Sequence, residues 1–329
     1  MAKIIAGLAS SHAFALIDAS DWDARRERNR LGYKKRYGVA PPAHPKLAEE
    51  NSEIRMLKHR NVRNGLDFLR DAVKQSTPDA IILIGDDQNE NFVETNLPQL
   101  AIYLGDTVVT TEPGKDGQRE RGPTYRCHAR LAKELLHGLV ERDFDVPSCA
   151  SFPRDELISH AHGPIMRTVD PEAKVPFVLL FVNAIHVPTI GPARCYRLGQ
   201  AIRDILGCNG SGDRVAIYAS GGLSHFTSGY PWPHYKGPYS YGSISEDFDR
   251  KVMAALARGE GEKLAQLTSS DLLENGDIEF RSWMVLLGAV GNVPTKVNVY
   301  EPIYSAIGGM GVAYWDLEEK SPVLRTQRR

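Results

Sequence analysis

Residues 214–226 read RVAIYASGGLSHF, an apolar run that is followed by a glycine turn and a histidine. Val215–Tyr218 is rich in residues that favour a buried strand. The run ends at Ser220-Gly221-Gly222, where two residues without a Cβ allow a sharp turn. His225 then lies just past the strand, at the edge where open α/β sheets bind ligands. A histidine here either caps the turn or acts chemically, and similar residues at two other strand ends favour the second role.

The composition is that of an ordinary globular protein. The chain has 329 residues, 42% of them hydrophobic and 25% charged, with a net charge of −1. This balance gives no field of one sign that would attract nucleic acid or an anionic membrane. No apolar run approaches the roughly 18 residues of a membrane span, and the first residues lead into a strand rather than a signal peptide. With four scattered cysteines that lack C-x-x-C spacing, the sequence predicts a cytoplasmic protein with reduced thiols.

Apolar runs of strand length alternate with amphipathic segments along the chain. Strands are expected at 3–8, 80–84, 101–104, 176–182, 215–218 and 296–300, and helices at 46–74, 125–142, 191–206, 244–258, 261–267 and 277–290. This order predicts an α/β fold, a three-layer sandwich with helices on both faces of a largely parallel or mixed central sheet. We expect one catalytic domain over residues 1–316 and a mobile tail over 317–329. A charge-dense run at 21–36 is typical of a solvated helix face.

Side chains with catalytic chemistry follow three of the expected strands. His12 follows the first, Asp86-Asp87-Gln88 the second long one, and His225 a later one, while Glu279 begins a helix. Because parallel strands end at one edge of a sheet, these side chains can converge. Histidines with one carboxylate are the ligands of non-haem Fe(II), and a further histidine could serve as general base. The alternative role for the aspartates is to cap a helix.

Two other enzyme classes are not indicated. No G-x-G-x-x-G motif follows a strand and no P-loop is present, so nucleotide binding has no support. The G-x-S-x-G elbow of α/β-hydrolases is also absent.

Five segments together resemble a known enzyme family. They are SSH at 10–12, GDDQ at 85–88, CYRLGQAI at 195–202, GGLSH at 221–225 and EFRSW at 279–283. In this combination and order they resemble the class III extradiol ring-cleavage dioxygenases, the LigB-like family that includes protocatechuate 4,5-, gallate and 3-O-methylgallate dioxygenases. The resemblance implies a non-haem Fe(II) enzyme of aromatic compound catabolism, an oxidoreductase that opens a catecholic ring and incorporates both atoms of O₂.

The resemblance also implies roles for single residues. His12 and Glu279 match iron ligands. His225 matches the acid/base that deprotonates the catechol and later protonates the leaving hydroxyl. His160 or His162 matches a histidine that contacts substrate or assists catalysis. His162 is favoured because it precedes a glycine, although the sequence around His160 fits some methylgallate-type members.

Further contacts are expected with a small aromatic substrate. Asn183 ends the strand at 176–182 and Ser224 lies within GGLSH, and both are candidate substrate-binding residues. A carboxylate on the substrate would need a cation, for which the candidates are Arg126, Arg154, Arg167 and Arg281. We expect O₂ as co-substrate, a homodimer, and as an alternative a small accessory subunit, with no nucleic-acid or membrane partner.

One position departs from the family pattern. The family's second iron-ligating histidine falls where this chain has Gln88, and an amide oxygen is a weaker donor to Fe(II) than imidazole. Gln88 could itself ligate the metal, with Asp86 or Glu90 beside it. His44 or His59 could take its place. The site could also hold metal poorly, and the protein would then be a metal-dependent hydrolase on the same scaffold or an inactive interaction protein.

Overall fold

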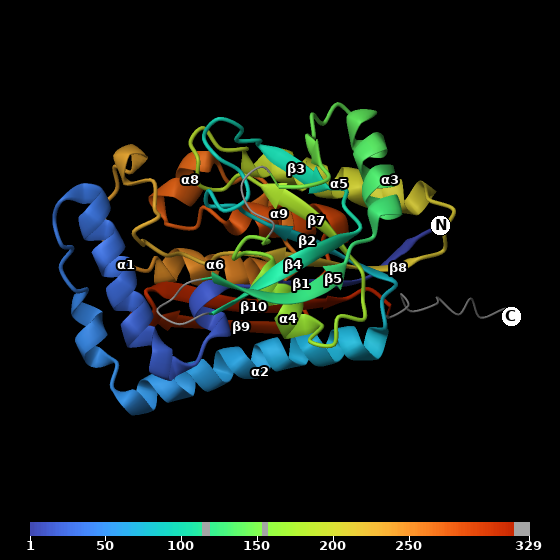
Figure 1. The fold of residues 1–329 in the computed structure, drawn as a ribbon. Helices are drawn as coiled ribbons and strands as arrows, with labels where there is room; N and C mark the ends of the chain where they lie inside the picture. The colour runs from blue at the N-terminus through green and yellow to red at the C-terminus, as the bar shows by residue number, and fades with distance from the viewer. Residues whose placement is uncertain (114–118, 153–156, 319–329) are drawn as a thin grey trace, which may run out of the picture.

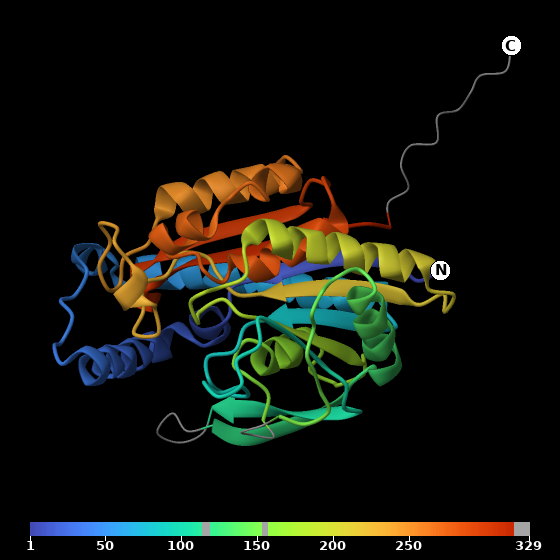
Figure 2. The ribbon, with the colours of Figure 1, turned by 90° about the horizontal axis from the view of Figure 1, so that it is seen from above.

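A computed structural model describes residues 1–113, 119–152 and 157–318 of the chain. Its main sheet has eight strands in the order β6-β3-β7-β2-β8-β1-β10-β9, and β4 and β5 form a separate pair. The strands are β1 (Lys3–Ser10), β2 (Ala80–Gly85), β3 (Leu100–Tyr103), β4 (Thr107–Pro113), β5 (Arg119–Arg126), β6 (Ser148–Cys149), β7 (Phe177–Val182), β8 (Arg214–Ser220), β9 (Val297–Ile303) and β10 (Gly308–Asp316). Figure 2 shows the β4–β5 pair set apart from the main sheet.

The helices form a layer on each face of the main sheet. They are α1 (Trp22–Tyr37), α2 (Ser52–Ser76), α3 (Ala129–Val140), α4 (Gly163–Val169), α5 (Pro192–Cys208), α6 (Glu246–Ala257), α7 (Gly261–Leu264), α8 (Ser269–Glu274) and α9 (Phe280–Val290). Apolar side chains of α3, α5 and α9 share one core with the strands, and those of α2 and α4 share another. Figure 1 shows α2 below the sheet and α3 and α5 above it.

The centre of the sheet is parallel, and an antiparallel strand adjoins it on each side. Strands β7, β2, β8 and β1 run parallel to one another, while β3 and β10 join them in the opposite direction. β2 and β7 are buried along their whole length, as expected for strands that are covered on both faces. The predicted α/β fold, with helices on both faces of a mixed central sheet, is therefore confirmed.

α2 begins later than the sequence pattern predicts. The expected helix started at residue 46, but Pro45–Glu49 forms a 3-10 turn and the α-helix begins at Ser52. The side chain of Asn51 accepts a hydrogen bond from the backbone N–H of Ile54, which caps the helix. The amphipathic pattern is continuous across this boundary, so only the cap marks it.

Four strands were not expected from the sequence. β4 and β5 pair with each other, and β5 extends over the first two residues, 125–126, of the segment that we expected to be helical. β6 is a two-residue strand that pairs with β3. β10 pairs antiparallel with β1 and inserts between β1 and β9. Of the predicted mobile tail at 317–329, residues 319–329 lie outside the described residues. Across the described ranges, no helix combines the length and the apolar character needed to cross a lipid bilayer.

The carboxyl ends of β1, β2 and β8 lie side by side. Ser10 pairs with Ser220, and Ile84 pairs with Ala219. The segments that follow these three strands therefore leave the sheet at the same edge, which is where such sheets place their ligand sites.

Candidate metal centre and active site

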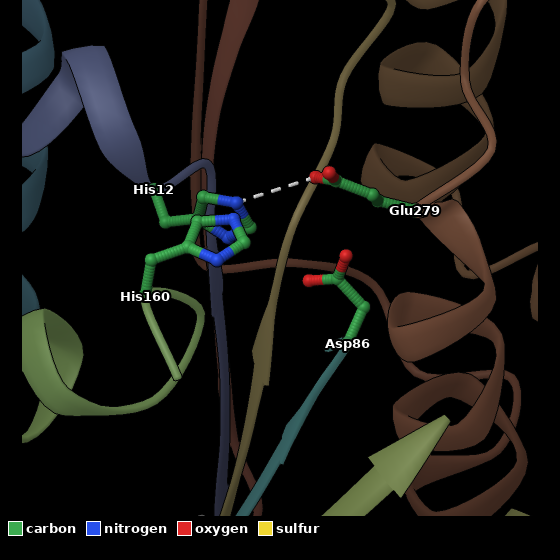
Figure 3. Close-up of side chains that lie close together, drawn as sticks. All are labelled: His12, Asp86, His160 and Glu279. Atoms are coloured by element: carbon green, nitrogen blue, oxygen red, sulfur yellow. Dashed lines mark ion pairs between the residues drawn. The ribbon is translucent and has the colours of Figure 1, made fainter. Parts of the chain in front are cut away.

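His12 follows β1 directly and is held against the end of β8. Its Nδ1 atom lies 3.1 Å from Oγ of Ser220. This contact leaves Nε2 directed at Glu279, 3.5 Å from Oε2 of the carboxylate. Figure 3 shows the two side chains approaching from opposite sides of the strand edge.

Glu279 reaches this point from the N-terminal end of α9. Its Oε2 atom accepts a hydrogen bond from the backbone N–H of Gly222 at 2.9 Å. The turn after β8 passes so close that a Cβ atom on Gly221 would lie 2.9 Å from Cβ of Glu279. The φ angles of Gly221 and Gly222 are 133° and 65°, values that favour glycine. The Gly-Gly pair therefore allows the carboxylate to sit beside His12.

Four side chains form a group that could hold a metal ion. They are His12, Asp86, His160 and Glu279, whose potential ligand atoms all lie within 4.8 Å of one another (Figure 3). All four belong to segments at the carboxyl edge of the sheet or to the loops above it. Two imidazoles with carboxylates are a suitable donor set for a first-row divalent metal. Oδ1 of Asp86 is buried and has no hydrogen-bond partner in the described structure, so a cation would satisfy it.

Burial and mutual repulsion dominate the electrostatics of this group. Burial lowers the pKa of His12 to about 3, against the attraction of Glu279, and the neutral imidazole that burial favours is the form that binds a metal. Burial, followed by the nearby Glu279 carboxylate, raises the pKa of Asp86 to about 8. Burial alone would raise the pKa of Glu279, but the imidazoles of His225 and His12 hold it well below its usual value. A divalent cation among these groups would relieve the repulsion between the two carboxylates.

His160 enters the group from the loop before α4. Its Nδ1–H donates to Oε2 of Glu90 at 2.6 Å, and its ring meets that of His12 edge to face, with centroids 4.7 Å apart. Burial opposes the charged form, but the Glu90 carboxylate raises the pKa of His160 to about 10. A carboxylate that holds one nitrogen of a histidine leaves the other directed at a metal, which is the usual second layer of a metal site.

His162 lies elsewhere, contrary to the preference from sequence. It is fully buried, and its Nε2–H donates to the carbonyl oxygen of Leu180 at 3.2 Å. Its Nδ1 lies 2.8 Å from Oγ of Ser159. Both ring nitrogens are thus engaged in the core, and of the two histidines it is His160 that faces the site. The backbone turns between them, so two residues that are close in sequence point in different directions.

His225 lies on the other side of Glu279. Its Nδ1–H donates to the carbonyl oxygen of Leu223 at 2.7 Å, which fixes the orientation of the ring. Its Nε2 lies 3.3 Å from Oε1 of Glu279. Burial would lower the pKa of His225, but the carboxylate of Glu279 and the carbonyl of Leu223 raise it to about 9. An imidazole with one nitrogen fixed and the other near the reaction site can take up and return a proton.

Gln88 is part of the same site and acts in it as a hydrogen-bond donor. Its Nε2 lies 3.3 Å from Oε1 of Glu279 and 3.4 Å from Oδ2 of Asp86. The two histidines considered as its replacement lie outside the group. His44 stacks on Tyr304, and His59 packs edge to face on Trp22. The second imidazole of the group that could hold a metal ion belongs to His160.

The group opens into a cavity of about 620 Å³. His12, Gln88, His160, His225 and Glu279 all contribute to its wall. The remaining wall includes residues of α1, α4 and β4, the 3-10 turn at Ala13–Leu16 and the start of β10 with the residues just before it. A volume of this size falls within the roughly 300–1,000 Å³ of pockets that bind small organic molecules.

Comparison with known proteins agrees with this arrangement. The family model of the catalytic LigB subunit of aromatic ring-opening dioxygenase matches residues 45–314. The chain belongs to the LigB family. The match begins after His12 and α1, so the first iron-ligand candidate of this LigB-family chain lies outside the matched residues.

Several relatives of this LigB-family chain are dioxygenases by name. A gallate dioxygenase of Pseudomonas putida is 26% identical over 215 residues, which are 63% of this chain and 59% of the relative. The chain therefore spans less than two thirds of that relative. A 2,3-dihydroxyphenylpropionate/2,3-dihydroxicinnamic acid 1,2-dioxygenase of Comamonas testosteroni is 24% identical over 288 residues, 74% of this chain and 86% of the relative. An uncharacterized protein of Escherichia coli K12 overlaps with 94% of this chain and 99% of its own at 15% identity and a TM-score of 0.44, a likeness that carries no inference about function.

The two predicted substrate-binding residues do not reach the cavity. The amide of Asn183 donates to the carbonyl oxygen of His186 at 2.7 Å and organises the turn after β7. The hydroxyl of Ser224 donates to Oδ2 of Asp249 at 2.7 Å, within the core. Both side chains support loops of the LigB fold, so their positions favour structural roles.

The four arginines that were candidates to bind a substrate carboxylate lie in different parts of the structure. Arg167 contributes to the cavity wall. Arg126 donates to the carbonyl oxygen of Lys174, and Arg281 donates to backbone carbonyls in the core. Arg154 lies outside the described residues.

Sequence reasoning missed two arginines of α1. Arg25 and Arg28 also contribute to the cavity wall, although the charge-dense run that contains them is typical of a solvated helix. The signal that could have found them is the short connection between His12 and α1. A connection of that length keeps the helix close to the edge of the sheet where His12 lies.

Proposed function

We propose that this chain is a non-haem Fe(II)-dependent extradiol dioxygenase that cleaves a catecholic aromatic ring with O₂. The observation that carries the proposal is the buried group of two histidines and two carboxylates, with a further histidine 3.3 Å from one of those carboxylates. Membership of the LigB family and the names of the relatives support the same chemistry.

The residues present fit a ferrous ion. His12, His160 and Glu279 would hold it, with Asp86 as a further carboxylate ligand and Gln88 donating to the carboxylates. When bound, Fe(II) would bring a catecholate and O₂ into contact and pass electron density between them.

Side chains of the protein would transfer the proton of the catechol hydroxyl. Nε2 of His225 would take a proton from a catechol hydroxyl and return it to the leaving oxygen after the ring opens. The hydrogen bond to Leu223 keeps this ring in place during both transfers. Glu90 keeps His160 in its orientation, and the N–H of Gly222 keeps the Glu279 carboxylate facing His12.

The decisive experiment measures iron and oxygen on the same samples. Protein loaded anaerobically with ferrous ion should consume O₂ with at least one of protocatechuate, gallate, 3-O-methylgallate or homoprotocatechuate. His225→Ala should lower turnover by about 10²–10⁴-fold and keep its iron. His137→Ala serves as the control, because that histidine is on the exposed face of α3.

Two outcomes would contradict the proposal. Loss of iron in His225→Ala would make that residue a ligand rather than the acid/base. Anaerobic turnover of an ester or amide, with no O₂ uptake on any catechol, would instead support a metal-dependent hydrolase.

A further inference from the structure

Helix α1 brings positive charge to the wall of the cavity. Arg25 and Arg28 of this helix line the cavity, and so does Arg167 of α4, which pairs with Glu112 at 3.9 Å. Nowhere in residues 1–113, 119–152 and 157–318 does a carboxylate lie within ion-pair distance of Arg25 or Arg28. Figures 1 and 2 both show α1 at the end of the molecule opposite the N-terminus, which is the end at which β1 stops.

Arg25 is the best placed of the three. Its guanidinium carbon lies 5.3 Å from the centre of the Phe14 ring, a contact that fixes the group against the cavity wall. Burial, and then the charge of Arg28, lowers the pKa of Arg25. Glu90 is the acidic side chain that attracts it, but both of its carboxylate oxygens are engaged by His160.

A guanidinium that is partly removed from water without a paired anion is costly. Phe14 offers its ring, Glu90 attracts Arg25 and Arg28 repels it, so the described neighbours give this guanidinium no ion pair. An anion that enters the cavity would pair with Arg25 through two parallel N–H donors, which is the geometry that guanidinium groups favour with carboxylates.

The cavity can hold a ligand that reaches both features. His12, Glu279 and His225 line the same space as the arginines. Its volume of about 620 Å³ is in the range of pockets for drug-sized molecules, so it has room for more than one aromatic ring. One ligand can therefore place its hydroxyls at the group that could hold a metal ion (His12, Asp86, His160 and Glu279, called the metal group below) and a charged substituent at α1.

We propose that Arg25, assisted by the charge of Arg28, binds a carboxylate substituent of the catecholic substrate. α1 is then the element that selects acidic catechols over neutral ones. This inference rests on the proposed function for the catechol end of the ligand, but the anion subsite itself can be tested without turnover.

The experiment compares acids with their primary amides. The probes are 3,4-dihydroxybenzoate, 3,4-dihydroxyphenylacetate and 3-(3,4-dihydroxyphenyl)propionate, each paired with its amide. Binding to iron-loaded protein is measured anaerobically by calorimetry, and kcat and KM are measured in air. The wild-type protein should bind at least one acid more tightly than its amide, and the preferred pair reports the length of the substituent.

Arg25→Gln should weaken binding of that acid by at least about tenfold, leave binding of the amide nearly unchanged and keep the iron content. Arg25→Lys should retain part of the preference, because it keeps the charge and loses the paired donors. Arg30→Gln is the matched control. It removes the same charge from the same helix, but Arg30 pairs with Glu27 and is not part of the cavity wall.

The outcomes separate the subsite from the catalytic proposal. Equal binding of acid and amide by the wild-type protein, or an equal loss of both in Arg25→Gln, overturns the assignment of Arg25 even if O₂ is consumed. Arg25-dependent binding of acids without O₂ uptake supports the subsite and contradicts the dioxygenase. An Arg30→Gln variant that behaves like Arg25→Gln also overturns the assignment, because a general field of the helix would then be responsible.

Discussion

Nε2 of Gln88 lies 3.3 Å from Oε1 of Glu279, so an amide stands where a histidine was expected. The same nitrogen lies 3.4 Å from Oδ2 of Asp86. One amide group has two N–H donors, and here they bridge two buried carboxylates that would otherwise repel each other. Gln88 thereby contacts two of the four side chains that could hold a metal ion, and His160 is the second imidazole of that group.

This arrangement predicts opposite effects for two substitutions at position 88. Gln88→Ala removes the donors and should weaken iron binding by about 10–100-fold, the usual effect of losing an outer hydrogen bond at a metal site. Gln88→His adds an imidazole and should strengthen binding. Competition with a ferrous chelator under anaerobic conditions measures both affinities. An unchanged affinity in both variants would place residue 88 outside the metal site.

His160 and His162 provide a matched pair of substitutions. His160→Ala should lower the iron content, because it removes one of the two imidazoles of the metal group. His162→Ala should keep its iron and lose about 1–3 kcal/mol of unfolding free energy, the cost of breaking buried hydrogen bonds. Metal analysis and urea unfolding separate the two effects. Full iron retention by His160→Ala would remove that residue from the ligands.

Glu50 predicts a pH dependence of stability. Its carboxylate accepts hydrogen bonds from the backbone N–H groups of Tyr304 and Ser305 and pairs with Lys58 at 2.7 Å. Burial would raise the pKa of Glu50, but the Lys58 ammonium and the Ser305 donors lower it overall. A depressed pKa stabilises the folded state above the unfolded value of about 4.3, and this contribution is lost as the pH falls through the folded value.

Glu50→Gln should therefore destabilise the protein by about 1–3 kcal/mol at pH 7, with a difference that shrinks as the pH falls below about 4. Urea unfolding of both proteins across this pH range measures the effect. Glu49→Gln is the control, since Glu49 is exposed beside it. A difference that grows toward low pH would contradict the assignment.

The central strands could be predicted because their burial is complete. β2 and β7 are uninterrupted apolar runs, and such runs rarely occur outside a covered sheet. β10 escaped prediction because three glycines at its start are typical of a turn. Packing explains those glycines, since a Cβ on Gly309 would collide with the Asp249 carboxylate and one on Gly311 would lie 3.0 Å from Leu223.

The site could be predicted as far as regular strand ends define it. His12 and His225 follow strands and Glu279 precedes α9, and the structure brings all three together. The choice between His160 and His162 depends on a turn, for which spacing in sequence gives no direction. Arg25 belongs to a helix whose charge pattern is typical of a solvated surface, although the helix lies near the edge of the sheet that carries the site. Long-range contacts decide both cases, and only the short connection between His12 and α1 indicates the second of them in the sequence.

The contact between α5 and α9 sets the position of Glu279 and gives the last prediction. The two helices approach so closely that a Cβ on Gly288 would collide with the carbonyl oxygen of Tyr196, and a Cβ on Gly199 with that of Val285. Gly288→Ala should cost about 1–3 kcal/mol of unfolding free energy, as overpacking usually does. It should also weaken iron binding, because α9 begins directly after Glu279. Gly207→Ala in α5 has open space around it and should be neutral or stabilising by up to about 1 kcal/mol. If Gly288→Ala and Gly207→Ala are equally stable in urea, the two helices can move apart without cost. The contact between α5 and α9 would then not be what positions the Glu279 carboxylate.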